Sequence, residues 1–223
     1  MAENKELIEG QKEPWENIES WFTANRNVVL GVLTVLILGI GGILGYKNLY
    51  VAPREGQAQD RIFHAQKYFQ QDSLQLALNG DGLNPGFSQI TKQYGMTPTG
   101  KLAHGYAAIC NLRLGNHAEA IKHGKKYSGD DEWLTSRVYT TLGHANGEKG
   151  DLNTAMRWYE RAAMASENEI TTPRNYYLAG MTAMEVKDYR SATNFFAKIK
   201  DGYPQSQEGR NIDKYIALAE ELQ

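Results

Sequence analysis

The chain has 223 residues, of which 41% are hydrophobic and 22% charged, and its formal net charge is −2. Five of the 24 Lys and Arg residues and seven of the 26 Asp and Glu residues precede Gly56, so the rest of the chain carries no net formal charge. Without a basic excess we do not expect a nucleic-acid-binding protein, and a single cysteine, Cys110, excludes an intramolecular disulfide.

Residues 1–26 predict an acidic head that contains an amphipathic helix. Six glutamates and only two lysines lie in the first 25 residues. Trp15, Ile18, Trp21 and Phe22 fall on one side of a helix, and aromatic side chains of this kind suit the headgroup region of a membrane. We therefore expect Trp15, Trp21 and Phe22 to anchor the head at the membrane interface.

Residues 27–46 are predicted to form a single transmembrane helix. Val28 to Tyr46 gives nineteen consecutive uncharged residues, about 29 Å of helix against the roughly 30 Å hydrocarbon core of a bilayer. The alternative is a cleaved signal peptide. However, the preceding residues are acidic, the apolar run exceeds the roughly 7–15 residues of a signal, and no small-residue pair follows it. Gly41 and Gly45 form a G-x-x-x-G pattern, which predicts contact with a partner helix.

The charges that flank this segment do not determine its orientation. Lys12 and Arg26 precede it, and Lys47, Arg54 and Arg61 follow within roughly 20 residues, which leans slightly toward a cytoplasmic body. Because long domains cross membranes regardless of such charges, both orientations stay open. Residues 47–56 are predicted to be a juxtamembrane linker and residues 57–223 a helical body.

The body begins with what we interpret as a divergent first repeat. Gln57 to Gln71 predicts one helix and Phe87 to Tyr94 a shorter one. A stretch rich in glycine and proline, from Asn79 to Gly86, separates them.

Three later segments align on a common frame that ends at Ala120, Ala155 and Ala192. These alanines are 35 and 37 residues apart, close to the 34-residue period of tetratricopeptide repeats, which this frame resembles. In such repeats small residues let paired helices pack closely while aromatic residues fill the space between pairs. The second segment resembles the repeat best, with Tyr139, Leu142, Gly143, Gly150, Ala155, Tyr159 and Ala162 at the signature positions.

The predicted fold is therefore all-α: a single N-terminal transmembrane helix, then an α-solenoid like those of tetratricopeptide-repeat proteins. The solenoid, residues 57–223, has three recognisable repeats, the divergent first repeat and a capping helix around Ile212 to Leu218. The resemblance implies that the first helix of each pair lines a concave groove for a peptide or partner protein. The residues expected in this groove are Ile109, Arg113, Arg137, Thr140, His144, Arg174, Tyr177, Met181 and Met184.

No catalytic, metal-binding or cofactor-binding residue is predicted, and an enzyme is not expected. The five histidines are scattered, and none forms the i, i+4 pair with a neighbouring glutamate that a zinc hydrolase helix needs. His117 and His123 fall near a repeat turn, where solvated side chains are expected. Cys110 lies in an apolar stretch, so we expect a buried thiol.

Trp15 to Tyr46 resembles the N-terminal region of the ancillary SecYEG translocon subunit family, the YfgM-like proteins. The residues that carry the resemblance, besides the repeats, are Phe22, Asn25, Gly31, Gly39, Gly41, Gly42, Gly45 and Tyr46. The loop rich in glycine and proline departs from that family. The resemblance implies a bacterial inner-membrane protein with a cytoplasmic N-terminus and periplasmic repeats. Its implied partners are the translocon, a membrane-anchored periplasmic chaperone of the peptidyl-prolyl isomerase type, and unfolded or nascent chains.

Two functions are consistent with these expectations. The first is a non-enzymatic protein that assists secretion at the Sec translocon. The alternative is an import receptor or a scaffold whose repeats face the cytosol. The side of the membrane on which the body lies distinguishes them.

Overall fold

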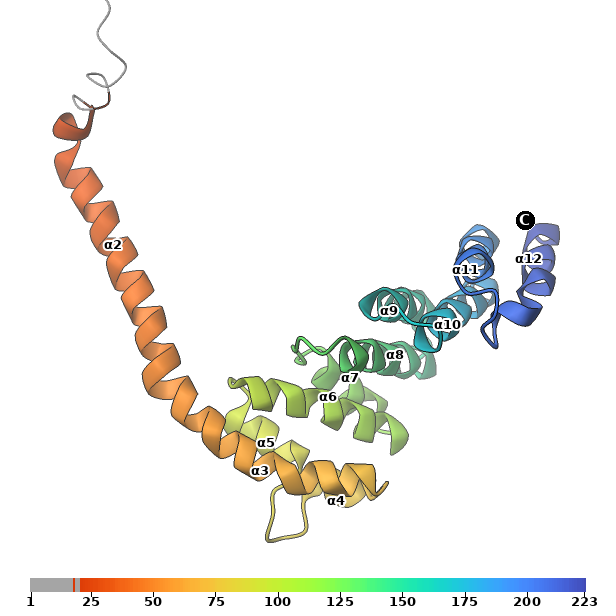
Figure 1. Ribbon diagram of the computed structural model, residues 1–223, viewed down its shortest axis with the longest axis horizontal. Helices are drawn as coiled ribbons and strands as arrows, with labels where there is room; N and C mark the ends of the chain where they lie inside the picture. The colour runs from red at the N-terminus through yellow and green to blue at the C-terminus, as the bar shows by residue number, and fades with distance from the viewer. Residues whose placement is uncertain (1–17, 19–20) are drawn as a thin grey trace, which may run out of the picture. The chain divides into compact units, whose positions relative to one another are not determined.

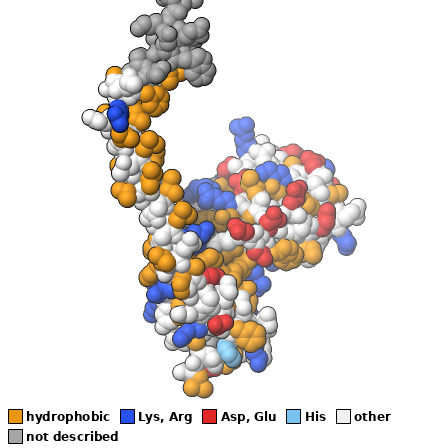
Figure 2. All heavy atoms as spheres, turned by 60° about the vertical axis from the view of Figure 1, so that its left-hand side comes forward, with side chains coloured by type: hydrophobic (Ala, Val, Ile, Leu, Met, Phe, Trp, Pro, Cys, Tyr) orange, Lys and Arg blue, Asp and Glu red, His pale blue; other side chains and the backbone are white. Residues whose placement is uncertain are grey.

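The computed structural model describes Ile18 and residues 21–223 (Figure 1). Trp15 and most of the predicted acidic head lie outside the described residues. The chain divides into two compact units, of which the first ends at Val51 and the second begins at Ala52. Apolar side chains cover the helix of the first unit, whereas acidic and basic side chains are mixed on the visible face of the second (Figure 2).

The first unit is helical. Helix α2 spans Arg26–Gly45 and a π-helical segment, η1, spans Tyr46–Val51. Among the described residues one helix is long and apolar enough to cross a membrane, and α2 forms its apolar part. None of the α2 side chains is buried. Residues 47–56, predicted as a linker, are helical, in η1 and in the first turn of the helix that follows.

The second unit is a row of α-helices, and residues 52–223 contain no strand (Figure 1). Each helix contacts the next one along the chain, as in an α-solenoid. The predicted fold class is therefore confirmed. The helices are α3 (Ala52–Gln70), α4 (Leu74–Asn79), α5 (Phe87–Tyr94), α6 (Pro98–Arg113), α7 (His117–Gly124), α8 (Glu132–Glu148), α9 (Leu152–Ala165), α10 (Thr171–Glu185), α11 (Tyr189–Gly202), the short 3-10 turn η2 (Gly209–Asn211) and α12 (Ile212–Glu221).

The turn between the two helices of a repeat has the same backbone geometry four times. A residue with left-handed backbone follows the first helix, at Asp72, Gly115, Gly150 and Lys187, with φ of 61°, 80°, 81° and 62°. In each turn the next backbone N–H donates to the carbonyl oxygen five residues before it, at 2.8 to 3.0 Å. This is the Schellman motif, which satisfies carbonyl groups that a helix end leaves unpaired. The four turns therefore define four repeats.

The turn at Asp72 shows that α3 and α4 form the first repeat. Ala77, five residues after Asp72, is fully buried, as are the alanines at the same place in the other repeats. The sequence prediction paired the helix at 57–71 with the helix at 87–94 and missed α4. The reason is that α4 has six residues and ends at a glycine, which gives too short a pattern to recognise.

The second helix of the first repeat is interrupted by residues 80–86. Here the Asp81 carboxylate accepts two backbone N–H bonds from the loop and a hydrogen bond of 2.7 Å from the Tyr68 hydroxyl. Helix α5 then brings Phe87 into the core, where its ring stacks on Tyr106 with 5.1 Å between centroids. The interruption therefore leaves the packing of the first repeat intact.

Two clusters of buried side chains form the core of the second unit. One joins α3 to α6 and contains Phe87 and Ile90. The other joins α9 to α12 and contains Phe196 and Ile212. Helices α7 and α8 lie between the two clusters along the chain.

Glycines at the helix contacts permit the close packing that the sequence predicts. A Cβ atom at Gly143 would overlap the ring of Tyr159, and the glycine at the same place in the next repeat faces Phe196 in the same way. Repeat α6–α7 differs, because Gly124 stands where the two later repeats have Tyr159 and Phe196. A Cβ there would lie 2.7 Å from a methyl carbon of Leu142, so the glycine makes room for this side chain.

Candidate functional site

A groove of about 340 Å³ lies among the first helices of the first three repeats. Its walls come from α3, α6 and α8 and from the residue that precedes α8. The residues that line it are Gln66, Phe69, Gln70, Tyr106, Ile109, Asp131, Trp133, Leu134 and Arg137.

Packed aromatic side chains make one side of this groove rigid. The rings of Phe69 and Tyr106 meet edge to face with 5.1 Å between centroids, and Tyr106 stacks on the buried Phe87. Trp133 lines the groove and is 61% exposed. Since a large aromatic side chain in water is a common contact point for partners, Trp133 marks the groove as a candidate binding surface.

The position of Trp133 follows from how α8 begins. Asp131 caps the helix, and its carboxylate accepts the backbone N–H of Leu134 at 2.7 Å. The Tyr127 hydroxyl is 3.1 Å from the Thr135 hydroxyl and ties the preceding loop to the first turn. The first turn of α8, which carries Trp133 and Leu134, is therefore fixed at the groove.

Polar groups lie beside the apolar wall. The Arg137 guanidinium lies over the Phe69 ring, 5.7 Å from its centroid. Gln66 and Gln70 add two side-chain amides. The amides and the guanidinium can donate hydrogen bonds to peptide carbonyl groups, and the amides can also accept them. The groove thus combines an apolar surface with groups that suit an extended polypeptide.

Of the nine residues predicted for the groove, Ile109 and Arg137 line it. Arg113 instead pairs with Asp72, with 2.6 Å between Nη1 and Oδ1, and joins the turns of two repeats. Thr140 donates a hydrogen bond of 2.7 Å to the Asn175 side chain and connects α8 to α10.

His144 and Arg174 lie farther along the array. The Nδ1 atom of His144 is 2.9 Å from the Tyr159 hydroxyl. Burial lowers the pKa of His144, and the positive charge of Arg174 lowers it further. Arg174 itself is exposed.

The last repeat is covered by α12. Tyr177 donates a hydrogen bond of 2.9 Å to the Tyr215 hydroxyl, and the centroids of the two rings are 5.2 Å apart. Met184 packs against the same buried cluster, while Met181 is exposed. The side chain of Tyr177 thus contacts the closing helix α12, whereas the sequence prediction had it contact a partner protein.

The predicted membrane contacts lie in the first unit. No heavy atom beyond the helix backbone lies within 4 Å of a Cβ built at Gly41 or Gly45, so both have open space around them. Trp21 and Phe22 are exposed and contact each other edge to face, with 5.4 Å between centroids. Trp15 lies outside the described residues.

Sequence reasoning missed most of the groove, in particular Phe69, Tyr106 and Trp133. Phe69 lies three residues before Asp72, where the other repeats have Leu112, Gly147 and Met184. The turn at Asp72 was not recognised because Asp72 is not a glycine and the helix after it, α4, has only six residues. Trp133 lies just before the repeat frame and has no position in it.

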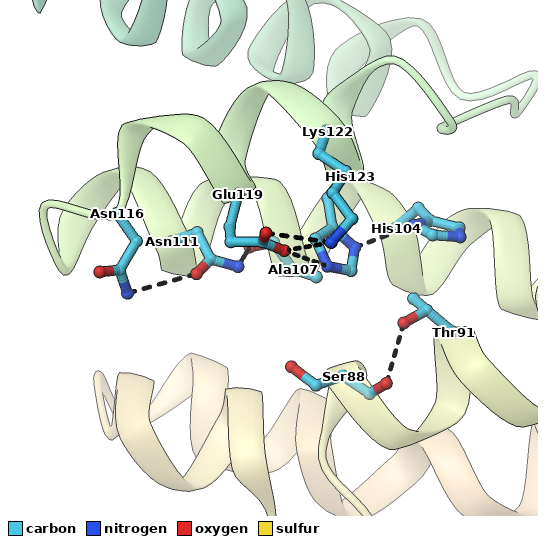
Figure 3. A network of polar contacts seen from close by, with 9 residues as sticks. All are labelled: Ser88, Thr91, His104, Ala107, Asn111, Asn116, Glu119, Lys122 and His123. Atoms are coloured by element: carbon cyan, nitrogen blue, oxygen red, sulfur yellow. Dashed lines mark hydrogen bonds and ion pairs between the residues drawn. The ribbon is translucent and has the colours of Figure 1, made fainter.

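A second polar cluster joins α6 to α7 (Figure 3). The Nδ1 atoms of His104 and His123 are 2.9 Å apart, so one ring donates its proton to the other. Burial lowers the pKa of His104 to about 4, with His123 as the second cause, and burial also lowers the pKa of His123. His123 is therefore not a solvated side chain, contrary to the expectation from its place near a turn.

Charged side chains surround His123 in this cluster. Lys122 binds Glu119 at 2.9 Å. The Glu119 carboxylate raises the pKa of His123, whereas the positive charges of Lys122 and Lys126 lower it. No group of three His, Cys, Asp or Glu side chains suited to a metal ion occurs in the described part of the chain. Cys110 is buried, and burial raises the pKa of its thiol to about 12, so the thiol is unreactive at neutral pH.

Comparison with known families gives a match to the tetratricopeptide repeat, which covers residues 136–169. These residues contain most of α8 and all of α9. Searches against curated proteins and against solved structures give no match. The chain thus contains a tetratricopeptide repeat, and such repeats imply a role in protein–protein interaction.

Proposed function

We propose that this repeat protein is a non-enzymatic membrane-anchored adaptor that holds extended polypeptide segments in the groove between α3, α6 and α8. One observation carries the proposal: Trp133, 61% exposed, lines an apolar groove whose other wall is fixed by packed aromatic rings. A rigid groove of this kind binds without reorganising, which favours affinity. Helix α2 would keep the groove beside a membrane.

We further propose that the protein assists secretion at the Sec translocon. The resemblance of Trp15 to Tyr46 to the ancillary translocon subunits supports this assignment, as does the order of an apolar helix followed by repeats. In this proposal α2 spans the bacterial inner membrane, Gly41 and Gly45 contact a partner helix, and the repeats lie in the periplasm. The partners are the translocon, a peptidyl-prolyl isomerase-type chaperone and emerging chains.

Co-purification tests the translocon assignment. The tagged full-length protein, extracted in mild detergent, should recover translocon subunits. A variant with Gly41 and Gly45 both changed to Leu should recover fewer, because the larger side chains prevent close approach of a partner helix. A matched change of Gly31, which lies outside the pattern, should have little effect. Recovery of no translocon subunit by the unmodified protein would contradict the assignment.

An import receptor or scaffold with cytosolic repeats is the second candidate. The basic residues Lys47, Arg54 and Arg61 after the apolar segment favour it. Protease treatment of cells distinguishes the two. A periplasmic body should resist protease in intact cells and be digested once the outer membrane is permeabilised. A cytosolic body should survive both treatments.

Substitution of Trp133 tests the groove itself. We expect Trp133→Ala to weaken capture of a labelled, permanently unfolded polypeptide by about 30-fold, the effect of losing an interface residue worth about 2 kcal/mol. Trp158→Ala is the control, since Trp158 packs against Tyr139 of its own repeat and does not line the groove. Equal affinity of the unmodified protein and Trp133→Ala, with unchanged unfolding curves, would exclude the groove as the binding surface.

A further inference from the structure

Two arginines on the first helices of consecutive repeats form no ion pair with any residue that the structure describes. Arg137 and Arg174 occupy the same place in their repeats, 13 residues before the left-handed turn residue. Both are exposed. The ion pairs found among the described residues include neither of them, in contrast to Arg113, which is neutralised by Asp72.

Both arginines place positive charge along the row formed by the first helices of the repeats. Arg137 lines the groove and lies over Phe69. Arg174 is close enough to α8 that its charge lowers the pKa of His144, a residue that the nearby Glu148 affects in the opposite direction. The hydrogen bond from Thr140 to Asn175 shows that side chains of α8 and α10 meet here.

The acidic residue of the groove does not cancel this charge. Asp131 directs its carboxylate to the backbone of Leu134, where it stabilises the N-terminal end of α8. Its oxygens form no ion pair with Arg137. A carboxylate brought by a ligand would therefore find both guanidinium groups available, and arginine binds carboxylates in a planar, two-pronged geometry.

We propose that the groove prefers extended polypeptide segments in which two acidic side chains accompany a large apolar one. The apolar side chain would contact Trp133 and Phe69, and the carboxylates would pair with Arg137 and Arg174. Helices that pack side by side have axes about 10 Å apart, and an extended chain covers that distance in about three residues. The acidic residues would accordingly be three positions apart. This proposal rests on the proposed function and specifies its ligand.

Three labelled peptides of one length test the preference. Each contains Leu-Phe between two variable positions three residues apart, which are both Glu, both Gln or both Lys. Binding to the full-length protein in detergent is followed by fluorescence anisotropy at low and high salt. We expect the Glu peptide to bind about tenfold more tightly than the Gln peptide and the Lys peptide most weakly. The advantage of the Glu peptide should shrink at high salt, because both arginines are exposed.

Two double variants with equal charge changes complete the test. R137Q/R174Q should lose the preference for the Glu peptide. R157Q/R190Q should keep it, since Arg157 is exposed on α9, where it bonds Thr154, and Arg190 is exposed on α11. The charge preference is overturned if the unmodified protein binds Glu and Gln peptides equally, or if R137Q/R174Q still distinguishes them.

The two proposals fail in different ways. Suppose that the unmodified protein binds all three peptides equally and that Trp133→Ala abolishes this binding. This result would overturn the charge preference and leave the groove as the binding surface. Absence of binding to any peptide would overturn both. Far-UV circular dichroism of each variant shows whether the helices are retained.

Discussion

Glycine and lysine can be exchanged between two of the left-handed turns, and the effect of each exchange on stability depends on the backbone conformation alone. Lys187 and Gly150 occupy the same place in consecutive repeats, with φ of 62° and 81°. Lys187 forms no ion pair among the described residues, and a Cβ built at Gly150 meets no heavy atom within 4 Å. We therefore predict that Lys187→Gly stabilises the protein and that Gly150→Lys destabilises it.

The size of the effect follows from two opposing terms. A residue with a side chain pays about 1–2 kcal/mol to adopt left-handed backbone. Glycine loses more freedom on folding, which costs about 0.5–1 kcal/mol. The net gain expected for Lys187→Gly is about 0.5–1 kcal/mol. For a unit of this size that corresponds to an increase in Tm of about 1–4 °C, and Gly150→Lys should lower Tm by a similar amount.

Thermal and urea unfolding of the full-length protein in detergent, followed by circular dichroism at 222 nm, measures both changes. Gly202→Lys is the matched control. Gly202 also has open space around its Cβ position, but it ends α11 with ordinary negative φ, so a lysine there should not destabilise the protein. A loss of stability in Lys187→Gly, or an equal loss in Gly150→Lys and Gly202→Lys, would refute the reasoning.

Three further predictions concern packing, pH and helix capping. Gly143→Ala should lower the free energy of unfolding by about 1–3 kcal/mol, because its methyl group overlaps the Tyr159 ring; a denaturation curve shows this. Because the pKa of His104 in the folded protein, about 4, lies below its ordinary 6.5, the unfolded chain binds more protons between these values. The free energy of unfolding should therefore fall as pH drops from 6.5 to 4. The fall should be smaller in His104→Gln, and Tm measured across that range tests both expectations. Asp151→Ala should cost about 1 kcal/mol, since the carboxylate caps α9 by accepting the Thr154 N–H at 3.1 Å; unchanged stability would contradict this.

The repeats from α6 to α11 were predictable because their signature residues are set by packing. Gly143 must be small where Tyr159 crosses it, and Ala155 must be small where helices meet. Such constraints act within about 20 residues and are visible in the sequence. The helical spacing of apolar residues then indicates the rest of each pair.

The groove was less predictable because it depends on contacts between distant segments. Phe69, Ile109 and Arg137 belong to three different helices and meet only when the repeats stack. Tyr177 illustrates the reverse case: its place in the repeat is typical of a groove residue, but α12 follows and contacts it. A pattern within one repeat does not indicate what covers it.

The division of the core into two clusters has a consequence for how the array opens. In a linear array each repeat is stabilised mainly by its neighbours, so a weak joint separates segments that unfold independently. Helix α7, eight residues long with Gly124 in place of an aromatic residue, lies between the two clusters, and we expect such a joint there. Amide protons of α3–α6 and of α9–α12 should then exchange with solvent at two different rates. A polypeptide held by α3, α6 and α8 would bridge the joint and slow amide exchange on both sides of it. With the ligand bound, the two segments would unfold as one cooperative unit.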